Sequence, residues 1–349
     1  MSFHMNHYFN NDSLRRLLYP IIITKDHILR LNRKSMLKNM LKSKPLCGII
    51  PPLVTPLKDN ETLDVESLEK LIEHLIAGGV HGLFILGTTG EEQSLSYGVR
   101  QQMIRESARI NNGRLPLLVC VTDTSMVESI RLAGVAADCG ADGVVSAPPY
   151  YFATGQPELA QFYEELVPQL PLPVFLYNMP SHVKVSFAPD TVRRIAQNPQ
   201  VIGFKDSSAN AVYFQSVMYK MKERPDFAML VGPEEITGEC VLLGGHGGIN
   251  GGANMFPELY VAMYDAAIRR DINRILELQQ YIMQISTSIY TVGKHGSSYL
   301  KGLKCALSLL GIIKDDFVAS PFYKFEEPER EKIRQALAAL PIKDGKLCI

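Results

Sequence analysis

From Gly48 onward, short apolar runs alternate with segments in which apolar residues recur every three or four positions. The second kind of segment predicts amphipathic helices, as in Val65–Ile76, Val127–Ala137, Leu159–Val167 and Ala211–Met221. The short runs predict eight strands, at Ile49–Val54, Gly82–Leu86, Leu115–Val121, Gly143–Ser146, Val174–Tyr177, Val201–Lys205, Phe227–Val231 and Gly247–Asn250. Strands separated by helical patterns of about 10–15 residues are typical of βαβ units in a parallel sheet.

Eight such units predict an α/β fold of the (β/α)8 TIM-barrel class, because eight strands close this barrel. A doubly wound sheet is the competitor, but no GxGxxG follows the first strand. The pattern then predicts a C-terminal helical extension, with helices at Leu259–Arg270, Ile272–Ile289, Tyr299–Leu310 and Pro328–Leu340. We therefore expect a barrel over residues 46–270 and a C-terminal helical subdomain with a loosely ordered tail over 271–349.

Residues 1–45 differ from the rest, because their many lysines and arginines face only two acidic residues, Asp12 and Asp26. The segment has no secretory signal pattern. Its basic character is similar to that of a transit peptide, but the apolar patch Ile21–Ile23 and the lack of serine enrichment argue against one. We expect a basic, partly disordered N-terminal extension, with Met36 or Met40 nearer the functional start.

Composition excludes several classes of partner. The chain has 349 residues, and its 36 Lys+Arg balance 36 Asp+Glu, which indicates neither a nucleic-acid nor a membrane-surface partner. No apolar run approaches the ~20 residues of a membrane helix. The six cysteines are scattered without a CxxC pair, so we expect a cytoplasmic location.

Candidate chemistry lies at the carboxyl ends of the predicted strands, where TIM barrels carry their active sites. Lys205 ends the apolar run Val201–Phe204. Most lysines at strand ends are surface charges, but a buried one would be desolvated and nucleophilic, as Schiff-base formation with a keto acid requires. The other strand ends carry Thr88 and Thr89, Tyr150 and Tyr151, Tyr177, Glu234 and Glu235, and Asn250.

The segment Gly87-Thr88-Thr89-Gly90-Glu91, which we call the threonine loop, has two interpretations. It could be a tight turn with a helix N-cap. It could also bind a carboxylate through hydroxyls and backbone N–H groups at a helix N-terminus. No Gly-Lys-Ser/Thr follows, so a phosphate-binding P-loop is excluded. Tyr177 and Tyr151 would form a proton-transferring hydroxyl chain if both phenols reached Thr88.

A metal site is the weaker hypothesis. Glu91, Asp206, Glu234 and Glu235 are the available carboxylates for Mg²⁺. Glu91 and Asp206 are better explained as structural anchors of their loops. We therefore expect neither a metal nor an organic cofactor.

Four co-linear motifs make the sequence resemble the dihydrodipicolinate synthase/N-acetylneuraminate lyase family. They are Gly87–Glu91, Tyr177-Asn178-Met179-Pro180, Gly203-Phe204-Lys205-Asp206 and Gly244–Ile249. The resemblance runs from Gly48 to about Gly311. It implies a class I aldolase barrel, a homotetramer built as a dimer of dimers, and small-molecule substrates, namely pyruvate and an aldehyde or a 2-keto acid.

The resemblance also implies a role for each matching residue. Lys205 matches the lysine that forms a Schiff base with pyruvate, and Tyr177 matches the phenol that relays protons. Thr88 and Thr89 match the hydroxyl pair, with Thr89 and its backbone holding the pyruvate carboxylate. Tyr151 matches a tyrosine that crosses the tight dimer interface to complete the relay in the neighbouring subunit. Gly232 and Ile249 match backbone positions that line the pyruvate pocket.

One position departs from the synthases of this family. They carry an arginine two residues after the Tyr-Asn-x-Pro motif, where it grips the carboxylate of aspartate semialdehyde, and this chain has His182 there. Neutral imidazole cannot offer the bidentate fork of a guanidinium, and Lys184 would substitute only as a point charge. Glu234 and Glu235 occupy the region that the sialic-acid lyases use to contact substrate hydroxyls. Alternatively, both point to solvent at a helix start.

Together these residues predict a Schiff-base-forming, pyruvate-dependent lyase acting on a 2-keto-3-deoxy sugar acid or a sialic-acid-like substrate. The substrate-binding set would be Thr89, Gly232, Ile249, His182 and Glu234. Three alternatives stay open. These are an authentic 4-hydroxy-tetrahydrodipicolinate synthase of lysine biosynthesis, a keto-deoxy sugar acid dehydratase, and an inactive barrel that binds a keto acid.

Overall fold

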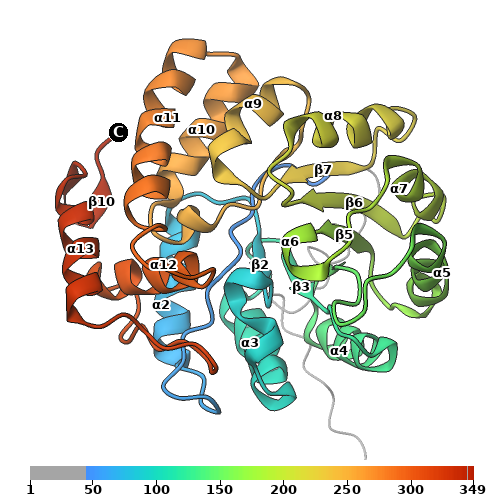
Figure 1. The fold of residues 1–349 in the computed structure, drawn as a ribbon, viewed down its shortest axis with the longest axis horizontal. Coiled ribbons are helices and arrows are strands. Elements are labelled where there is room, and N and C mark those ends of the chain that lie inside the picture. Colours follow the sequence, from blue (N-terminus) through green and yellow to red (C-terminus); the bar gives the residue numbers. More distant parts are fainter. Residues whose placement is uncertain (1–44, 344) are drawn as a thin grey trace, which may run out of the picture.

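A curled parallel sheet forms the centre of the molecule (Figure 1). The computed structural model describes residues 45–343 and 345–349, so nearly all of the predicted basic extension lies outside the described residues. Within the described part, eight strands pair in the order β1-β8-β7-β6-β5-β4-β3-β2. Their bounds are β1 Gly48–Ile49, β2 Leu83–Ile85, β3 Leu117–Cys120, β4 Gly143–Ser146, β5 Val174–Asn178, β6 Val201–Asp206, β7 Ala228–Val231 and β8 Gly247–Gly248.

The two edges of this sheet meet just beyond β1. A parallel bridge joins Pro52 to Phe84 in β2. The Leu53 N–H donates to the Phe84 carbonyl at 2.8 Å, and the Phe84 N–H donates to the Pro51 carbonyl at 3.1 Å. The curled sheet, parallel throughout and flanked by helices, agrees with the predicted (β/α)8 architecture.

The first and last strands are shorter than predicted. Ile49–Val54 was expected as one strand, but only Gly48–Ile49 pairs regularly, because Pro51 and Pro52 have no N–H to donate to the ladder. Gly247–Asn250 likewise reduces to Gly247–Gly248. At this junction the backbones approach closely, since a Cβ on Gly247 would lie 1.9 Å from the Gly48 carbonyl oxygen, and Gly247 has a φ of 148°.

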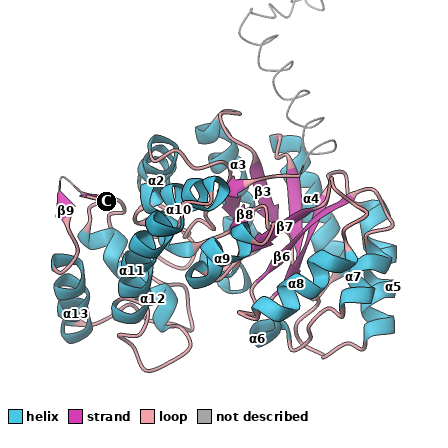
Figure 2. Cartoon of the chain, turned by 90° about the horizontal axis from the view of Figure 1, so that it is seen from above, coloured by secondary structure: helices cyan, strands magenta, loops and turns pink. Residues whose placement is uncertain are grey.

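Each strand is followed by helical structure, as the amphipathic patterns predict, and these helices lie outside the sheet (Figure 2). The strand side chains are buried, which explains why their sequences are almost continuously apolar. The helices after the strands are α2 Val65–Ala77, α3 Tyr97–Asn111, α4 Met126–Cys139, α5 Gln156–Leu166, α6 Pro180–Val183, α7 Pro189–Ile195, α8 Ala211–Lys220, α9 Thr237–Leu242 and α10 Pro257–Arg269.

The expected C-terminal helices lie together on one side of the sheet, at the left of Figure 1. They are α11 Ile272–Ser288, α12 Ser298–Leu309 and α13 Glu327–Ala338. Helix α11 packs against α10 and α13, and α12 packs against α13. The predicted tail contains a short antiparallel pair, β9 Ile342–Lys343 with β10 Lys346–Leu347.

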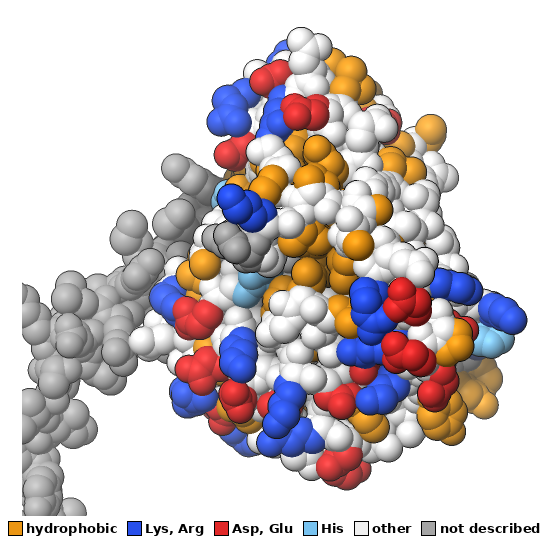
Figure 3. Space-filling model, turned by 90° about the vertical axis from the view of Figure 1, so that its left-hand side faces the viewer, with side chains coloured by type: hydrophobic (Ala, Val, Ile, Leu, Met, Phe, Trp, Pro, Cys, Tyr) orange, Lys and Arg blue, Asp and Glu red, His pale blue; other side chains and the backbone are white. Residues whose placement is uncertain are grey.

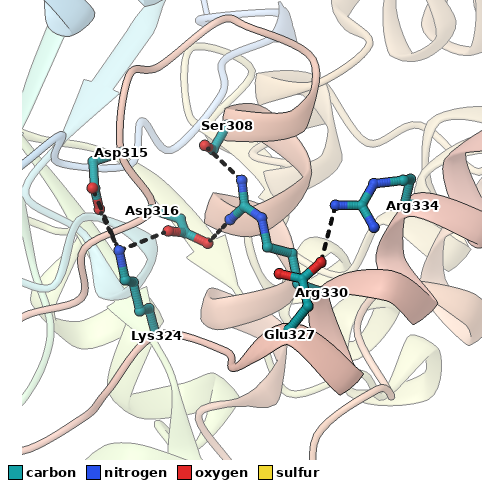
Figure 4. Close-up of polar contacts among 7 residues, drawn as sticks. All are labelled: Ser308, Asp315, Asp316, Lys324, Glu327, Arg330 and Arg334. Carbon is teal, nitrogen blue, oxygen red and sulfur yellow. Dashed lines mark hydrogen bonds and ion pairs between the residues drawn. The ribbon is translucent and has the colours of Figure 1, made fainter.

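A chain of ion pairs fixes the segment between α12 and α13 (Figure 4). Asp316, whose side chain is only 3% exposed, accepts from Arg330 at 2.6 Å and lies 3.7 Å from Lys324. Arg330 also donates to Ser308 in α12 at 3.3 Å. The outer pairs are exposed and contribute little each. Arg330 thus joins α13 both to the buried Asp316 and to the end of α12.

The outer face of the C-terminal helices shows lysine, arginine and acidic side chains interspersed, with hydrophobic side chains gathered near its centre (Figure 3). This mixture of charge agrees with the balanced composition. No helix in the described part of the chain is long and apolar enough to span a lipid bilayer.

Candidate active site

A pocket of about 1170 Å³ opens at the carboxyl ends of the strands. Its wall includes Thr88 after β2, Tyr177 in β5, Lys205 in β6, Gly232 after β7 and Ile249 after β8. Segments 290–301 and 321–323 of the C-terminal extension complete the wall. The strand ends singled out in the sequence therefore converge, and the extension contributes to the same cavity.

Lys205 lies inside this pocket with only 3% of its surface exposed, so it is not a surface charge. Its Nζ is 3.9 Å from the centroid of the Tyr177 ring and 4.9 Å from that of Phe84. Among the described residues, Nζ has neither a hydrogen-bond acceptor nor an acidic partner. Nζ is thus held against two aromatic faces inside the pocket, where a carbonyl carbon of a bound substrate could reach it.

The threonine loop brings its hydroxyls to the same place. Thr88 Oγ1 lies 3.0 Å from the Tyr177 hydroxyl, as the proton-relay hypothesis requires. The loop is a 3-10 turn at Thr88–Gly90 and not the start of α3, which begins at Tyr97. The helix N-terminus at this loop is therefore that of a short 3-10 turn after Gly87 and not that of α3, and the two threonine hydroxyls are the side-chain donors that the loop itself supplies.

A buried ion pair anchors the end of this loop. Glu91 adopts a left-handed backbone, with φ of 61°, and its side chain pairs with Lys304 of α12. Its other oxygen accepts from the Ala319 N–H at 2.8 Å, while Lys304 Nζ also donates to the Phe317 carbonyl at 2.6 Å. Both side chains are almost completely buried, at 0% and 1% exposure. Glu91 is therefore the structural anchor that the sequence predicted.

Asp206 anchors the end of β6 in the same way. Its Oδ1 accepts from the Asn178 side chain at 2.8 Å, and its Oδ2 accepts from the Ser208 hydroxyl at 2.9 Å. Burial raises the pKa of this carboxyl above its ordinary value. Because Asn178 ends β5, the bond ties the strand that carries Tyr177 to the strand that carries Lys205.

Gly232 and Ile249 line the pocket, as expected. The Gly232 N–H donates to the Asp206 carbonyl at 2.7 Å, and the Ile249 N–H donates to Val231 at 2.8 Å. A Cβ on Gly232 would lie 2.1 Å from Ser207 Oγ, so this position has no room for a side chain.

Glu234 is buried at the pocket wall and does not point to solvent. Its Oε1 accepts from the hydroxyls of Tyr260 at 2.6 Å and Tyr290 at 2.8 Å, and its Oε2 accepts from the Gly252 N–H at 2.8 Å. Burial raises the pKa of Glu234 to about 7. The neighbouring Glu235 accepts a hydrogen bond from Ser286 of α11. Both carboxyls thus face the C-terminal helices.

His182, which stands where the synthases of the family carry an arginine, lies at the pocket wall. His182, in α6, lines the pocket, and its Nδ1 is 2.9 Å from the Ser181 hydroxyl. Partial burial of the ring, and then the charge of Lys205, lower the pKa of His182. Lys184 does not line the pocket, and its Nζ donates to the Tyr151 carbonyl at 3.0 Å.

Tyr151 is the predicted site residue that the structure does not bring to the pocket of its own chain. It is 71% exposed and stacks edge-to-face on Phe152, which is 78% exposed. Its phenol therefore does not reach Thr88 within one chain. Among the described residues, no three histidine, cysteine or acidic side chains are grouped to hold a metal ion.

Sequence reasoning missed three residues of the extension, Tyr290, Tyr299 and Lys304. Tyr299 lines the pocket, and its hydroxyl lies 3.2 Å from Thr89 Oγ1. A signal for Lys304 was present, because it occupies the apolar stripe of α12 formed by Leu300, Leu303 and Leu307. A lysine on a buried helix face needs an acidic partner, and Glu91 provides it.

Comparison with known proteins gives a consistent result. The model of the dihydrodipicolinate synthetase family matches residues 45–340. A probable 2-dehydro-3-deoxy-D-pentonate aldolase of Escherichia coli K12 is 31% identical over 85% of this chain and 98% of its own. The structure of a dihydrodipicolinate synthase from Bacteroides thetaiotaomicron is 71% identical, with a TM-score of 0.83 over 85% of this chain and 99% of its own. The structure of YagE from Escherichia coli K12, in complex with pyruvate, is 29% identical, with a TM-score of 0.80 over 86% and 99%.

Proposed function

Because the chain belongs to the dihydrodipicolinate synthetase family, we propose that it is a pyruvate-dependent lyase in which Lys205 forms the Schiff base. Members of this family are class I aldolases and lyases, so the chain is an enzyme of that type. The observation that carries the role of Lys205 is its buried, unpaired amine in the pocket, 3.9 Å from the Tyr177 ring.

In the proposed cleavage reaction, the Lys205 amine attacks the C2 carbonyl of a 2-keto acid and water leaves. The protonated imine then accepts the electron pair of the breaking C3–C4 bond, while the C4 hydroxyl gives its proton to the relay of Tyr177 and Thr88. Tyr177 returns a proton to C3 of the enamine, and hydrolysis frees pyruvate and Lys205. The imine is itself the electron sink, so we propose that neither a metal nor an organic cofactor takes part.

For the substrate, we propose a 2-keto-3-deoxy sugar acid or a similar polyol acid. His182 has a lowered pKa and stands where a synthase would hold a carboxylate with an arginine, so neutral imidazole and the Ser181 hydroxyl face the substrate. Both groups suit hydroxyls better than a second carboxylate. The 31% identity to a probable pentonate aldolase supports this class.

A second candidate is 4-hydroxy-tetrahydrodipicolinate synthase, which condenses pyruvate with aspartate semialdehyde. Two observations favour it. The Bacteroides structure at 71% identity bears the synthase name. In addition, Lys301 lines the pocket and so places a positive charge in its wall, whereas Lys184 does not line the pocket. The distinction between the two candidates rests on whether the distal group of the substrate is a polyol or a carboxylate.

Two assays test these functions. Incubation with pyruvate and borohydride should modify the peptide that contains Lys205, and Lys205→Met should abolish this labelling. A wild-type enzyme that remains unlabelled would refute the mechanism. A retro-aldol screen of 2-keto-3-deoxy acids and sialic acid, with pyruvate as the readout, should then find a substrate. Turnover of aspartate semialdehyde alone would instead establish the synthase.

We also propose a homotetramer, built as a dimer of dimers, in which Tyr151 enters the site of the neighbouring subunit. The exposed pair Tyr151 and Phe152, both aromatic, supports an interface at this loop. Analytical ultracentrifugation should give four times the mass of the chain. A monomer that retains full activity would rule out a role for Tyr151 in a neighbouring site.

A further inference from the structure

Helix α12 reaches the threonine loop at the residue expected to hold the pyruvate carboxylate. The Tyr299 hydroxyl, near the start of α12, lies 3.2 Å from Thr89 Oγ1. Thr89 is only 5% exposed, and both residues line the pocket. In the described part of the chain, the Tyr299 hydroxyl has no other hydrogen-bond partner.

The bond between these hydroxyls has a direction once a carboxylate is bound. A carboxylate accepts hydrogen bonds only, so Thr89 must give its single hydroxyl proton to it. The Thr89 oxygen can then only accept, and the Tyr299 phenol must donate. Burial, followed by the charge of Glu234, raises the pKa of Tyr299, so the phenol keeps its proton.

The surroundings of Tyr299 hold its ring in this position. Its ring meets that of Tyr290 edge-to-face, with centroids 4.8 Å apart, and the Tyr290 hydroxyl donates to Glu234 at 2.8 Å. The backbone of Gly251 also lies close to this ring, and a Cβ on Gly251 would be 1.6 Å from the Tyr299 hydroxyl. Only glycine at position 251 therefore leaves room for the phenol.

We propose that Tyr299 is a positioning residue for the substrate carboxylate: it donates to Thr89 Oγ1 and so turns the Thr89 hydroxyl proton toward the carboxylate. This inference rests on the proposed function, in which Thr89 binds the carboxylate of pyruvate. It assigns to the C-terminal extension a part in substrate affinity that is separate from the chemistry at Lys205.

Borohydride trapping of pyruvate tests the proposal, because the half-saturating concentration and the maximal labelling of Lys205 are measured separately. Tyr299→Phe keeps the ring and removes the hydroxyl. We expect half-saturation to rise about 3- to 10-fold, the size of one hydrogen bond, with maximal labelling unchanged. Gly251→Ala should raise half-saturation similarly, because its Cβ displaces the phenol.

Tyr163→Phe is the matched control. It removes a fully buried hydroxyl that donates to the Ser146 carbonyl at 2.9 Å, outside the pocket wall, and should leave half-saturation unchanged. A Thr89→Val background supplies the second test. If Tyr299 acts through Thr89, adding Tyr299→Phe to Thr89→Val has no further effect on half-saturation.

The outcomes separate the two proposals. Wild-type enzyme that traps no pyruvate refutes the proposed function, and the inference with it. Wild-type enzyme that traps pyruvate while Tyr299→Phe has unchanged half-saturation overturns the inference alone. So does a fall in maximal labelling without a change in half-saturation, or a full effect of Tyr299→Phe in the Thr89→Val background.

Discussion

Replacing Lys304 by methionine should destabilise the protein more than a typical single substitution. The Lys304–Glu91 pair is 0% and 1% exposed, so the variant leaves a buried carboxylate without its counter-charge. Removing one partner of a buried pair costs about 3–5 kcal/mol. The Phe317 carbonyl also loses the donor that now lies 2.6 Å away. Against a total stability of about 5–15 kcal/mol, this is a large loss.

Urea unfolding, followed by circular dichroism at one fixed protein concentration, measures this loss. The double variant Lys304→Met with Glu91→Gln separates lost charge pairing from lost packing. Its neutral amide keeps an acceptor for the Ala319 N–H, which now donates to Glu91 at 2.8 Å. We expect the double variant to recover about half of the lost stability, because no unpaired charge stays buried. A Lys304→Met loss below about 1 kcal/mol, or a double variant less stable than the single one, would refute the reasoning.

Three further predictions concern pH, assembly and packing. Burial raises the pKa of Glu234 from 4.5 to about 7, so the folded state keeps a proton that the unfolded state releases, and stability falls as the pH rises through this window. In Glu234→Gln, the free energy of unfolding should fall less over this pH range, by up to about 3 kcal/mol. Urea unfolding at several pH values measures this, and an equal dependence of the free energy of unfolding on pH in variant and wild type would contradict it. Mixed oligomers of Tyr151→Phe and Lys205→Ala should regain activity that neither pure variant has, if Tyr151 acts in the neighbouring site; no regain over either variant would argue against it. Gly203→Ala should lower thermal stability by about 1–3 kcal/mol, because its Cβ would lie 2.3 Å from the Phe175 ring, whereas the same change at Gly134, where nothing lies within 4 Å, should not lower it.

The strands of the sheet and the place of Lys205 in the pocket could be predicted from the sequence for one physical reason. Parallel strands covered on both faces must be apolar along most of their length, so a polar residue at the end of such a run is conspicuous. Lys205, Thr88 and Tyr177 are residues of this kind. Parallel strands also bring their carboxyl ends to one edge, so three residues far apart in the chain could be expected in one site.

Contacts between the extension and the pocket could not be predicted in the same way. A tyrosine near the start of a helix, such as Tyr299, fits equally well in a packed core, and its partner Thr89 lies 210 positions away in the chain. The orientation of Glu234 was also open, because an acidic residue after a strand suits either solvent or a buried acceptor. Three donors decide it, and two of them are Tyr260 of α10 and Tyr290 of the turn that follows α11.

The threonine loop is held from two sides, and under the proposed function this arrangement separates substrate affinity from chemistry. The barrel contacts it through Tyr177, which lies 3.0 Å from Thr88 and beside Lys205. The extension contacts it through Tyr299 at Thr89 and through Lys304 at Glu91. In the proposed function, Thr88 belongs to the proton relay and Thr89 binds the substrate carboxylate. A change on the barrel side should therefore alter the rate of bond making or breaking. A change in α12 should alter the concentration of pyruvate that the enzyme needs, while Lys205 keeps its capacity to form the imine.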